Sequence, residues 1–136
     1  KGPSPYDALE IGLFRPREEL FQIIDARIDQ QIERGLVEEV QGLLAAGVPP
    51  TAAAMSSIGY RQLLPYLENA ISLETALERI RFDTHRYVRH QETWLRRNPR
   101  LVRFDVSAEG WRDRARAAVA AFLGREDELR SEPILN

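Results

Sequence analysis

The sequence predicts a mainly α-helical chain with two short β-strands. Over most of its 136 residues, apolar side chains recur every three or four positions, as they do along one face of a helix. Two short runs lack that period, and about 90 residues of helical pattern separate them, so they cannot form a hairpin. If the two strands pair, their pairing should be parallel. Two strands alone make a poor sheet, so we expect them to belong to a larger α/β sheet.

The two predicted strands differ in character. Ala8 to Phe14 is almost wholly apolar, which suits a strand in a sheet that is covered on both faces. Leu101 to Val106 follows Asn98 and Pro99, a pair that ends the preceding helical pattern.

Capping residues place the expected helices. Gly35 is positioned to end the first helix, and Ser72 is a good N-cap for the longest one. In chain order, the expected helices run from Pro16 through Ile32, Leu36 to Ala46, Thr51 to Met55, Tyr60 to Leu67, Leu73 to about Arg97 and Glu109 to Leu123.

The longest predicted helix carries one apolar stripe with few interruptions. Because Trp94 lies on this stripe, we expect it to pack in the core rather than to stack on a base. The stripe consists of Leu77, Ile80, Thr84, Tyr87, Val88, Gln91, Trp94 and Leu95.

Composition bounds the function classes. The length is that of about one domain, and residues 125–136 have the composition of a flexible polar tail. The chain has no cysteine, which excludes disulfides, thiol catalysis and thiolate zinc sites and is compatible with a reducing cytosol. No apolar run approaches the roughly 20 residues of a membrane helix, so we expect no membrane partner.

The basic residues exclude more chemistry. Of the 19 Lys and Arg residues only Lys1 is a lysine, so 18 are arginines. A P-loop needs a lysine after its glycines, and Schiff-base catalysis needs one as well, so neither is expected in this chain. Because the first residue is not methionine, we expect the chain to be a piece of a longer protein.

The charges are segregated along the sequence. The stretch from Arg79 to Arg103 holds eight arginines against Asp83 and Glu92, a surplus of six positive charges within a chain of net charge −2. A basic stripe on an acidic body is typical of a surface that binds a polyanion. The simpler alternative is a solvated helix face in an arginine-rich protein.

Three motifs, in this order and spacing, carry a family resemblance: GLVEEV at 35–40, IGYRQ at 58–62 and RYVRHQETWLRR at 86–97. Together they make the chain, from about Pro5 to Asp105, similar to the C-terminal half of tRNA dimethylallyltransferases, also called tRNA isopentenyltransferases. The resemblance implies the C-terminal portion of a P-loop-type α/β fold with a parallel sheet. Residues 1–124 would then be the C-terminal part of the transferase core domain.

The resemblance also implies an activity. Enzymes of this family transfer a dimethylallyl group from its diphosphate to N6 of the adenosine that lies 3′ of the tRNA anticodon. They use Mg²⁺, and their P-loop and catalytic residues lie in the N-terminal half. The chain alone is therefore expected to be inert, with no catalytic residue, metal ligand or cofactor of its own. Its expected partner is the tRNA anticodon stem-loop in the cytoplasm, and dimethylallyl diphosphate would bind through the N-terminal half.

Two RNA-contact segments of the family map onto this chain. At His90 the family usually has lysine or arginine, which weakens one phosphate contact or makes it depend on pH. Glu92 replaces a commonly apolar residue. The residues implied in RNA binding are Ser57, Ile58, Gly59, Tyr60, Arg61 and Gln62 in the first segment, and Arg89, His90, Gln91, Glu92, Thr93, Trp94, Leu95 and Arg96 in the second.

Physical chemistry supports part of this assignment. An enzyme that modifies an anticodon-loop base must hold a splayed loop by phosphate contacts, stacking and base-edge hydrogen bonds. Arginine suits this task because its planar guanidinium binds phosphate bidentately and stacks on bases. We therefore hypothesise that Arg61, Arg89 and Arg96 contact RNA. Gly59 would allow close backbone approach beside a helix that begins near Tyr60.

Two alternatives remain open at this point. One is a relative that transfers the isopentenyl group to free adenylate, against which the basic helix argues. The other is a stand-alone helical RNA-binding or interaction module without catalysis. A nucleotide-versus-tRNA substrate test separates the first from the transferase, and tRNA binding without any N-terminal half would favour the second.

Overall fold

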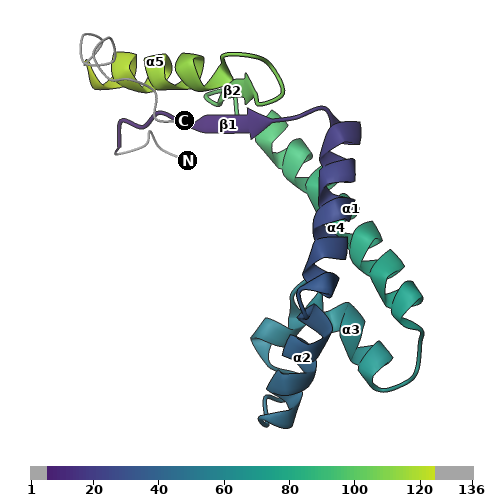
Figure 1. Ribbon diagram of the computed structural model, residues 1–136. Coiled ribbons are helices and arrows are strands. Elements are labelled where there is room, and N and C mark those ends of the chain that lie inside the picture. The colour runs from purple at the N-terminus through teal and green to yellow at the C-terminus, as the bar shows by residue number, and fades with distance from the viewer. Residues whose placement is uncertain (1–5, 125–136) are drawn as a thin grey trace. The chain divides into compact units, whose positions relative to one another are not determined.

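The computed structural model describes residues 6–124, and the chain divides into two compact units (Figure 1). One unit, the helical unit, comprises Glu18–Glu92. The other, the strand unit, contains residues 6–17 and 93–124 of the described part of the chain. The predicted tail at 125–136 lies outside the described residues.

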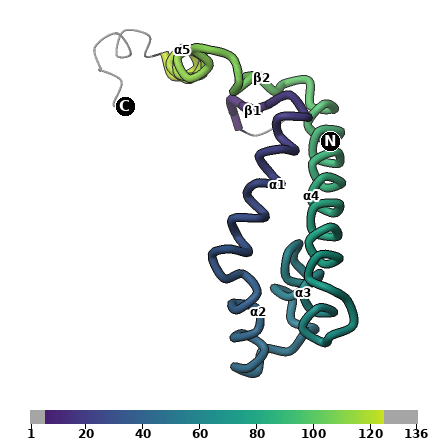
Figure 2. The backbone as a smooth tube through the Cα atoms, turned by 45° about the vertical axis from the view of Figure 1, so that its right-hand side comes forward, coloured from purple at the N-terminus to yellow at the C-terminus, as the bar shows by residue number. Residues whose placement is uncertain are grey.

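The helical unit contains four α-helices and one short 3₁₀ helix. Along the chain these are α1 (Arg17–Glu33), α2 (Leu36–Ala45), η1 (Ala53–Ser56), α3 (Tyr60–Leu67) and α4 (Leu73–Arg96), of which α1 and α4 extend a few residues beyond the unit. The two long helices, α1 and α4, lie side by side and run in opposite directions (Figure 2).

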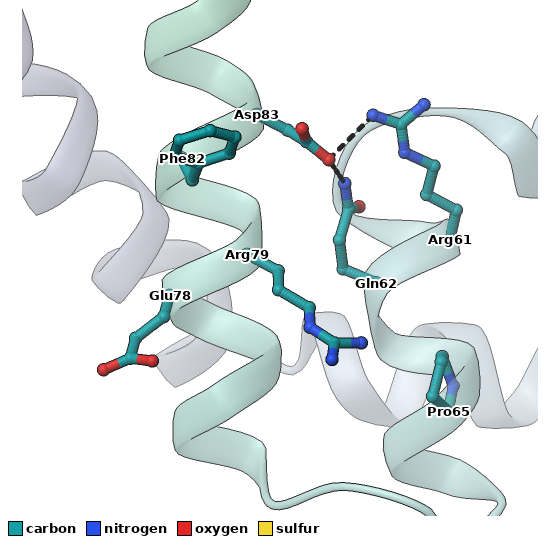
Figure 3. A pocket seen from close by; sticks show the side chains of 7 residues that line it. All are labelled: Arg61, Gln62, Pro65, Glu78, Arg79, Phe82 and Asp83. Atoms are coloured by element: carbon teal, nitrogen blue, oxygen red, sulfur yellow. Dashed lines mark hydrogen bonds and ion pairs between the residues drawn. The ribbon is translucent and has the colours of Figure 1, made fainter.

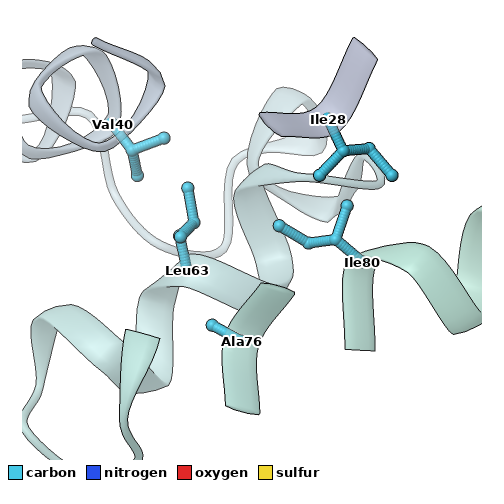
Figure 4. Close-up of a cluster of buried hydrophobic side chains, with 5 residues drawn as sticks. All are labelled: Ile28, Val40, Leu63, Ala76 and Ile80. Atoms are coloured by element: carbon cyan, nitrogen blue, oxygen red, sulfur yellow. The ribbon is translucent and has the colours of Figure 1, made fainter. Parts of the chain in front are cut away.

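The core of the helical unit forms where the helices meet. Each α-helix contributes at least one side chain to a buried cluster that consists of Ile28, Val40, Leu63, Ala76 and Ile80 (Figure 4). Leu63 and Val40 are fully buried, and Met55 of η1 is buried as well. The helical periodicity had predicted that these positions face inward, and this is confirmed for Ile28, Val40 and Ile80.

The predicted end signals are largely confirmed. Gly35 has φ +94° between α1 and α2, a conformation that glycine adopts without strain. The Oγ of Ser72 accepts a hydrogen bond of 3.1 Å from the backbone N–H of Thr75, as an N-cap does. These two caps fix where α1 ends and where α4 begins.

The segment predicted as a helix from Thr51 to Met55 is instead a 3₁₀ helix over Ala53–Ser56. The hydroxyl of Ser56 donates to the carbonyl oxygen of Ala53, and that of Ser57 donates to Ala54. The serine hydroxyls thus bond to carbonyl oxygens that would accept backbone N–H groups in an α-helix. The chain therefore makes only a short 3₁₀ turn here.

The prediction that Trp94 packs in the core is wrong, because this side chain is 70% exposed. Two other residues of the predicted stripe, Tyr87 at 55% and Gln91, are exposed as well. α4 meets α1 through Arg81 and His85. Because this contact uses one side of α4, the side that carries Tyr87, Gln91 and Trp94 faces outward.

The strand unit is built on one parallel pair. β1 (Ile11–Phe14) pairs with β2 (Val102–Asp105), with Ile11 opposite Val102 and Phe14 opposite Asp105. α5 (Trp111–Leu123) follows, and Gly124 ends it. The parallel pairing confirms the sequence prediction and, with the helices, the mainly α class with two short strands.

Side chains support the pairing at the N-terminal end of both strands. The Nη2 of Arg100 lies 2.7 Å from Oε1 of Glu10, and the side-chain amide of Asn98 also donates to this carboxylate. A Cβ on Gly12 would lie 2.7 Å from side-chain atoms of Leu101 and Phe14, so a larger residue there would force these side chains to shift. Within residues 6–124, Ile11 and Leu13 are exposed, so the described residues do not cover both faces of β1 as predicted.

No helix among residues 6–124 is long and apolar enough to cross a membrane.

Replacing Leu63 by alanine should destabilise the helical unit by about 2–5 kcal/mol, because the change removes a fully buried side chain and leaves a cavity. Urea unfolding followed by circular dichroism measures the effect. Ile23→Ala is the matched control, since Ile23 is half exposed on α1 and should change the free energy of unfolding far less. Equal losses in the two variants would contradict the proposed core.

Candidate nucleic-acid interface

The first predicted contact segment surrounds the N-terminus of α3. Gly59 precedes the helix with φ +103° and ψ −67°, a conformation that side-chain-bearing residues avoid. Its N–H donates a hydrogen bond of 2.9 Å to Oε1 of Gln62. A Cβ at Gly59 would meet only Leu36 at 3.9 Å, so the requirement for glycine comes from the backbone conformation and not from crowding.

Gln62 extends this arrangement to α4. The side chain is only 5% exposed, and its Nε2 donates a hydrogen bond of 2.7 Å to Oδ2 of Asp83. The buried amide is therefore satisfied on both its oxygen and its nitrogen, which removes the cost of burying an unpaired polar group. In the structure Gln62 thus joins α3 to α4, and its place in the RNA-contact segment stays a prediction.

Asp83 forms ion pairs with two neighbouring arginines, of which Figure 3 shows Arg61. Its Oδ2 also accepts a hydrogen bond of 2.9 Å from Nη2 of Arg61, and its Oδ1 lies 3.4 Å from Nη2 of Arg86. The hydrogen bond from Gln62, followed by the bond and charge of Arg61, lowers the pKa of Asp83 below its ordinary value. The carboxylate thus holds the guanidinium of Arg61 in one place at the start of α3.

Tyr60 is fixed on the opposite side of the same turn. Its hydroxyl donates a hydrogen bond to the carboxylate of Glu39 on α2, and this bond raises the pKa of Tyr60. Ser57 and Ile58, the remaining members of the segment, are exposed before the helix.

The second predicted segment lies further along α4. Arg89, His90 and Gln91 are exposed in the helical unit, and Glu92 is partly buried. Because Asp83 and His90 are seven residues apart on one helix, about 10 Å of axial rise separates the Asp83 cluster from His90. Residues 89–92 of the second segment therefore share the helical unit with the first segment but lie further along α4.

The rest of that segment belongs to the strand unit. Thr93 and Arg96 are exposed, and Leu95 is partly buried. Trp94 is exposed at the end of α4, which contradicts the prediction that it packs in the core. The exposed indole is therefore available to a partner, which was the less favoured interpretation of the sequence.

The basic stretch is partly neutralised within the protein. Arg81 pairs with Asp29 of α1, Arg86 with Asp83 and Arg100 with Glu10. The guanidinium of Arg103 lies 4.1 Å from the centre of the Phe14 ring. The surplus of positive charge that reaches solvent is accordingly smaller than a count along the sequence indicates.

One histidine of the basic stretch faces inward. The ring of His85 stacks on Phe21 with centroids 3.9 Å apart, and its Nε2 lies 2.9 Å from Oδ1 of Asp25. These contacts hold α4 against α1. Of the two histidines, only His90 is therefore exposed on the candidate interface.

The sequence did not reveal that Asp83 holds Arg61 and Gln62 by hydrogen bonds. In the sequence Asp83 counts only as an acid that reduces the charge surplus, and no local spacing connects it to Arg61 or Gln62. Among residues 6–124 no group of three His, Asp or Glu side chains is arranged to hold a metal ion.

Comparison with known proteins decides the family. A family model described as IPP transferase matches residues 1–98. The tRNA dimethylallyltransferase of Thermomicrobium roseum is 50% identical over 124 residues, which are 91% of this chain and 38% of that protein. The chain belongs to the IPP transferase family. A second relative, the tRNA dimethylallyltransferase of Chloroflexus aggregans, is 47% identical over 81% of this chain and 37% of its own length.

Solved structures of the IPP transferase family have the same fold. The full-length tRNA isopentenylpyrophosphate transferase from Bacillus halodurans aligns with a TM-score of 0.83 at 28% identity, over 95% of this chain and 43% of that one. The corresponding Staphylococcus epidermidis structure aligns at a TM-score of 0.79 and 28% identity, over 88% of this chain and 39% of its own. The chain thus spans less than half the length of these relatives, and its fold is the C-terminal part of the family's P-loop-type fold, as predicted.

Asp83→Asn should make the helical unit less sensitive to acid. The folded-state pKa of Asp83 is lowered, so its carboxylate stabilises the fold above an unfolded pKa near 3.8, and this contribution is lost as the pH falls through the folded value. The stability gap between wild type and variant should therefore be largest near neutral pH and should close below pH about 4.

Urea unfolding at neutral pH and at pH about 3 measures this gap. Glu68→Gln serves as a control, because it removes one exposed carboxylate from the same unit. A gap of equal size at both pH values would show that the Asp83 carboxylate does not carry the interaction.

Proposed function

We propose that this chain is the C-terminal part of a tRNA dimethylallyltransferase and that it supplies contacts to the tRNA anticodon stem-loop. The observation that carries the proposal is the match to such enzymes over 91% of the chain. Dimethylallyl diphosphate, Mg²⁺ and the groups that act on them are assigned to the remainder of the enzyme. The reaction is assigned to the cytoplasm, where its tRNA substrate occurs.

The chain's own part in the reaction is to hold RNA. A base in the anticodon loop must leave its stack before its exocyclic amine can react, and the loop must be held in that state. Arg61 is anchored by Asp83 and so presents its remaining N–H donors in a fixed direction. A pre-positioned guanidinium loses less conformational entropy on binding phosphate than a free one does.

The exposed part of α4 supplies the second group of contacts. Arg89 offers positive charge, His90 offers ring nitrogen atoms, and Gln91 offers an amide that can bind a base edge. Trp94, which is exposed in the strand unit, offers a ring for stacking.

A chimaeric enzyme tests the proposal directly. The matching C-terminal segment of the Thermomicrobium roseum enzyme is replaced by this chain, and dimethylallyl transfer to an anticodon stem-loop RNA is measured. Transfer by the chimaera, and none by the truncated relative alone, is the expected result. A folded chimaera that binds dimethylallyl diphosphate but modifies no RNA would overturn the proposal.

Two outcomes of the same experiment would favour the alternatives. Transfer to free adenosine monophosphate in place of RNA would indicate the adenylate-modifying relative. RNA binding by the 136-residue chain, combined with a folded but inactive chimaera, would indicate a binding module without a part in catalysis.

Replacing Arg89 by alanine in the chimaera should weaken binding of the stem-loop RNA and reduce the slope of log affinity against log salt by about one, because one phosphate contact is lost. Fluorescence anisotropy at several salt concentrations measures both quantities. Arg116→Ala, an exposed arginine of α5 outside the basic stretch, is the matched control. An unchanged slope in the Arg89 variant would count against this contact.

A further inference from the structure

A hollow of about 440 Å³ lies between α3 and α4, and it includes two residues of the first predicted RNA-contact segment, Arg61 and Gln62. With Pro65 these line it from α3, and Glu78, Arg79, Phe82 and Asp83 line it from α4 (Figure 3). Its volume falls within the range of sites that hold small organic molecules. Arg79, Phe82 and Pro65 belong to neither RNA-contact segment.

Two guanidinium groups approach this hollow from opposite helices. Arg61 is held by the carboxylate of Asp83, and Arg79 extends from α4 toward α3 on the same side (Figure 3). Among residues 6–124 the Arg79 guanidinium has no hydrogen-bond or ion-pair partner. Arg81, two residues further along α4, pairs with Asp29 and so joins α4 to α1, whereas Arg79 makes no such contact among the described residues.

The acidic groups nearby do not cancel this charge. Asp83 already shares its two oxygens among Arg61, Gln62 and Arg86. Glu78 also lines the hollow, but its carboxylate points away from α3 and from the Arg79 guanidinium (Figure 3). The surface between Arg61 and Arg79 is therefore suited to an anion.

Phe82 adds an aromatic ring at the edge of the hollow. It is 62% exposed and lies one helical turn from Arg79. A ring beside two guanidinium groups is the combination that binds single-stranded nucleic acid, in which the cations contact the backbone and the ring stacks on a base. An acidic peptide would use the cations but would leave the ring without a planar partner.

We propose that the hollow is a subsite for one unpaired nucleotide of the bound RNA, with its phosphate between Arg61 and Arg79 and its base on Phe82. The inference rests on the proposed function, because RNA must be the partner of this surface. It extends the RNA footprint from the start of α3 down the first half of α4.

Binding of a labelled anticodon stem-loop RNA to the 136-residue chain, followed by fluorescence anisotropy, tests the subsite. Phe82→Ala should weaken binding about five-fold or more at an unchanged salt slope, because stacking is lost and charge is not. Arg79→Ala should reduce the salt slope by about one, and Arg79→Lys should restore it. Phe82→Trp, which keeps a stacking surface, should retain the wild-type affinity.

Matched controls come from α5. Phe122→Ala and Arg116→Ala make the same chemical changes at exposed positions outside the helical unit and should leave binding unchanged. Circular dichroism melting checks that each variant is folded. As a measurement that needs no variant, 4-thiouridine placed in the RNA loop should cross-link to a peptide that contains Phe82.

The outcomes separate the two proposals. If the wild-type chain binds the RNA, and both the Phe82 and Arg79 variants bind it with the wild-type affinity and salt slope, the subsite is overturned and the RNA-contact function stands. An equal loss for Phe82→Ala on a fully paired duplex would also overturn it, because paired bases cannot stack on the ring. If the wild-type chain binds no RNA, the subsite and the contact function of the isolated chain fail together.

Discussion

The arrangement of the candidate interface depends on one carboxylate. Asp83 on α4 accepts hydrogen bonds from Gln62 and Arg61, which are consecutive residues of α3. Through Gln62 it also supports the N–H of Gly59, so the turn before α3, its first arginine and the middle of α4 form one hydrogen-bonded system. Removing the carboxylate would leave a buried amide and a guanidinium without an acceptor, and such groups are costly inside a protein.

This hydrogen-bonded system shows why the number of arginines in the sequence overstates the positive charge that the folded surface offers to a partner. Several arginines of the basic stretch join elements of the protein to one another, as Arg81 does with Asp29. The side chains left for a partner are selected by their neighbours and not by their position in the stretch. The resulting surface presents the guanidinium group of Arg61, which Asp83 holds, together with exposed rings such as Phe82.

Local patterns predicted the local structure well. The bounds of α3 and the cap at Ser72 follow from periodicity and end signals that act over a few residues. The exposure of Trp94 could not be predicted in this way, because it depends on which side of α4 meets α1. The link from Asp83 to Gln62 spans 21 residues and leaves no periodic trace, so only the folded helices reveal it. The family motifs lie on or beside α2, α3 and α4, and they do not distinguish exposed side chains from side chains that support the fold.

The parallel pairing of β1 with β2 has a consequence for how the chain folds. Its two strands come from segments separated by the entire helical unit, so their pairing must close a very long loop and has a high contact order. The helical unit has its own core of neighbouring helices, whose contacts are closer in sequence. If this core forms first, it draws Phe14 and Val102 toward each other and shortens the effective loop. The strands would then join late, and the rate of that last step would report on the stability of the helices.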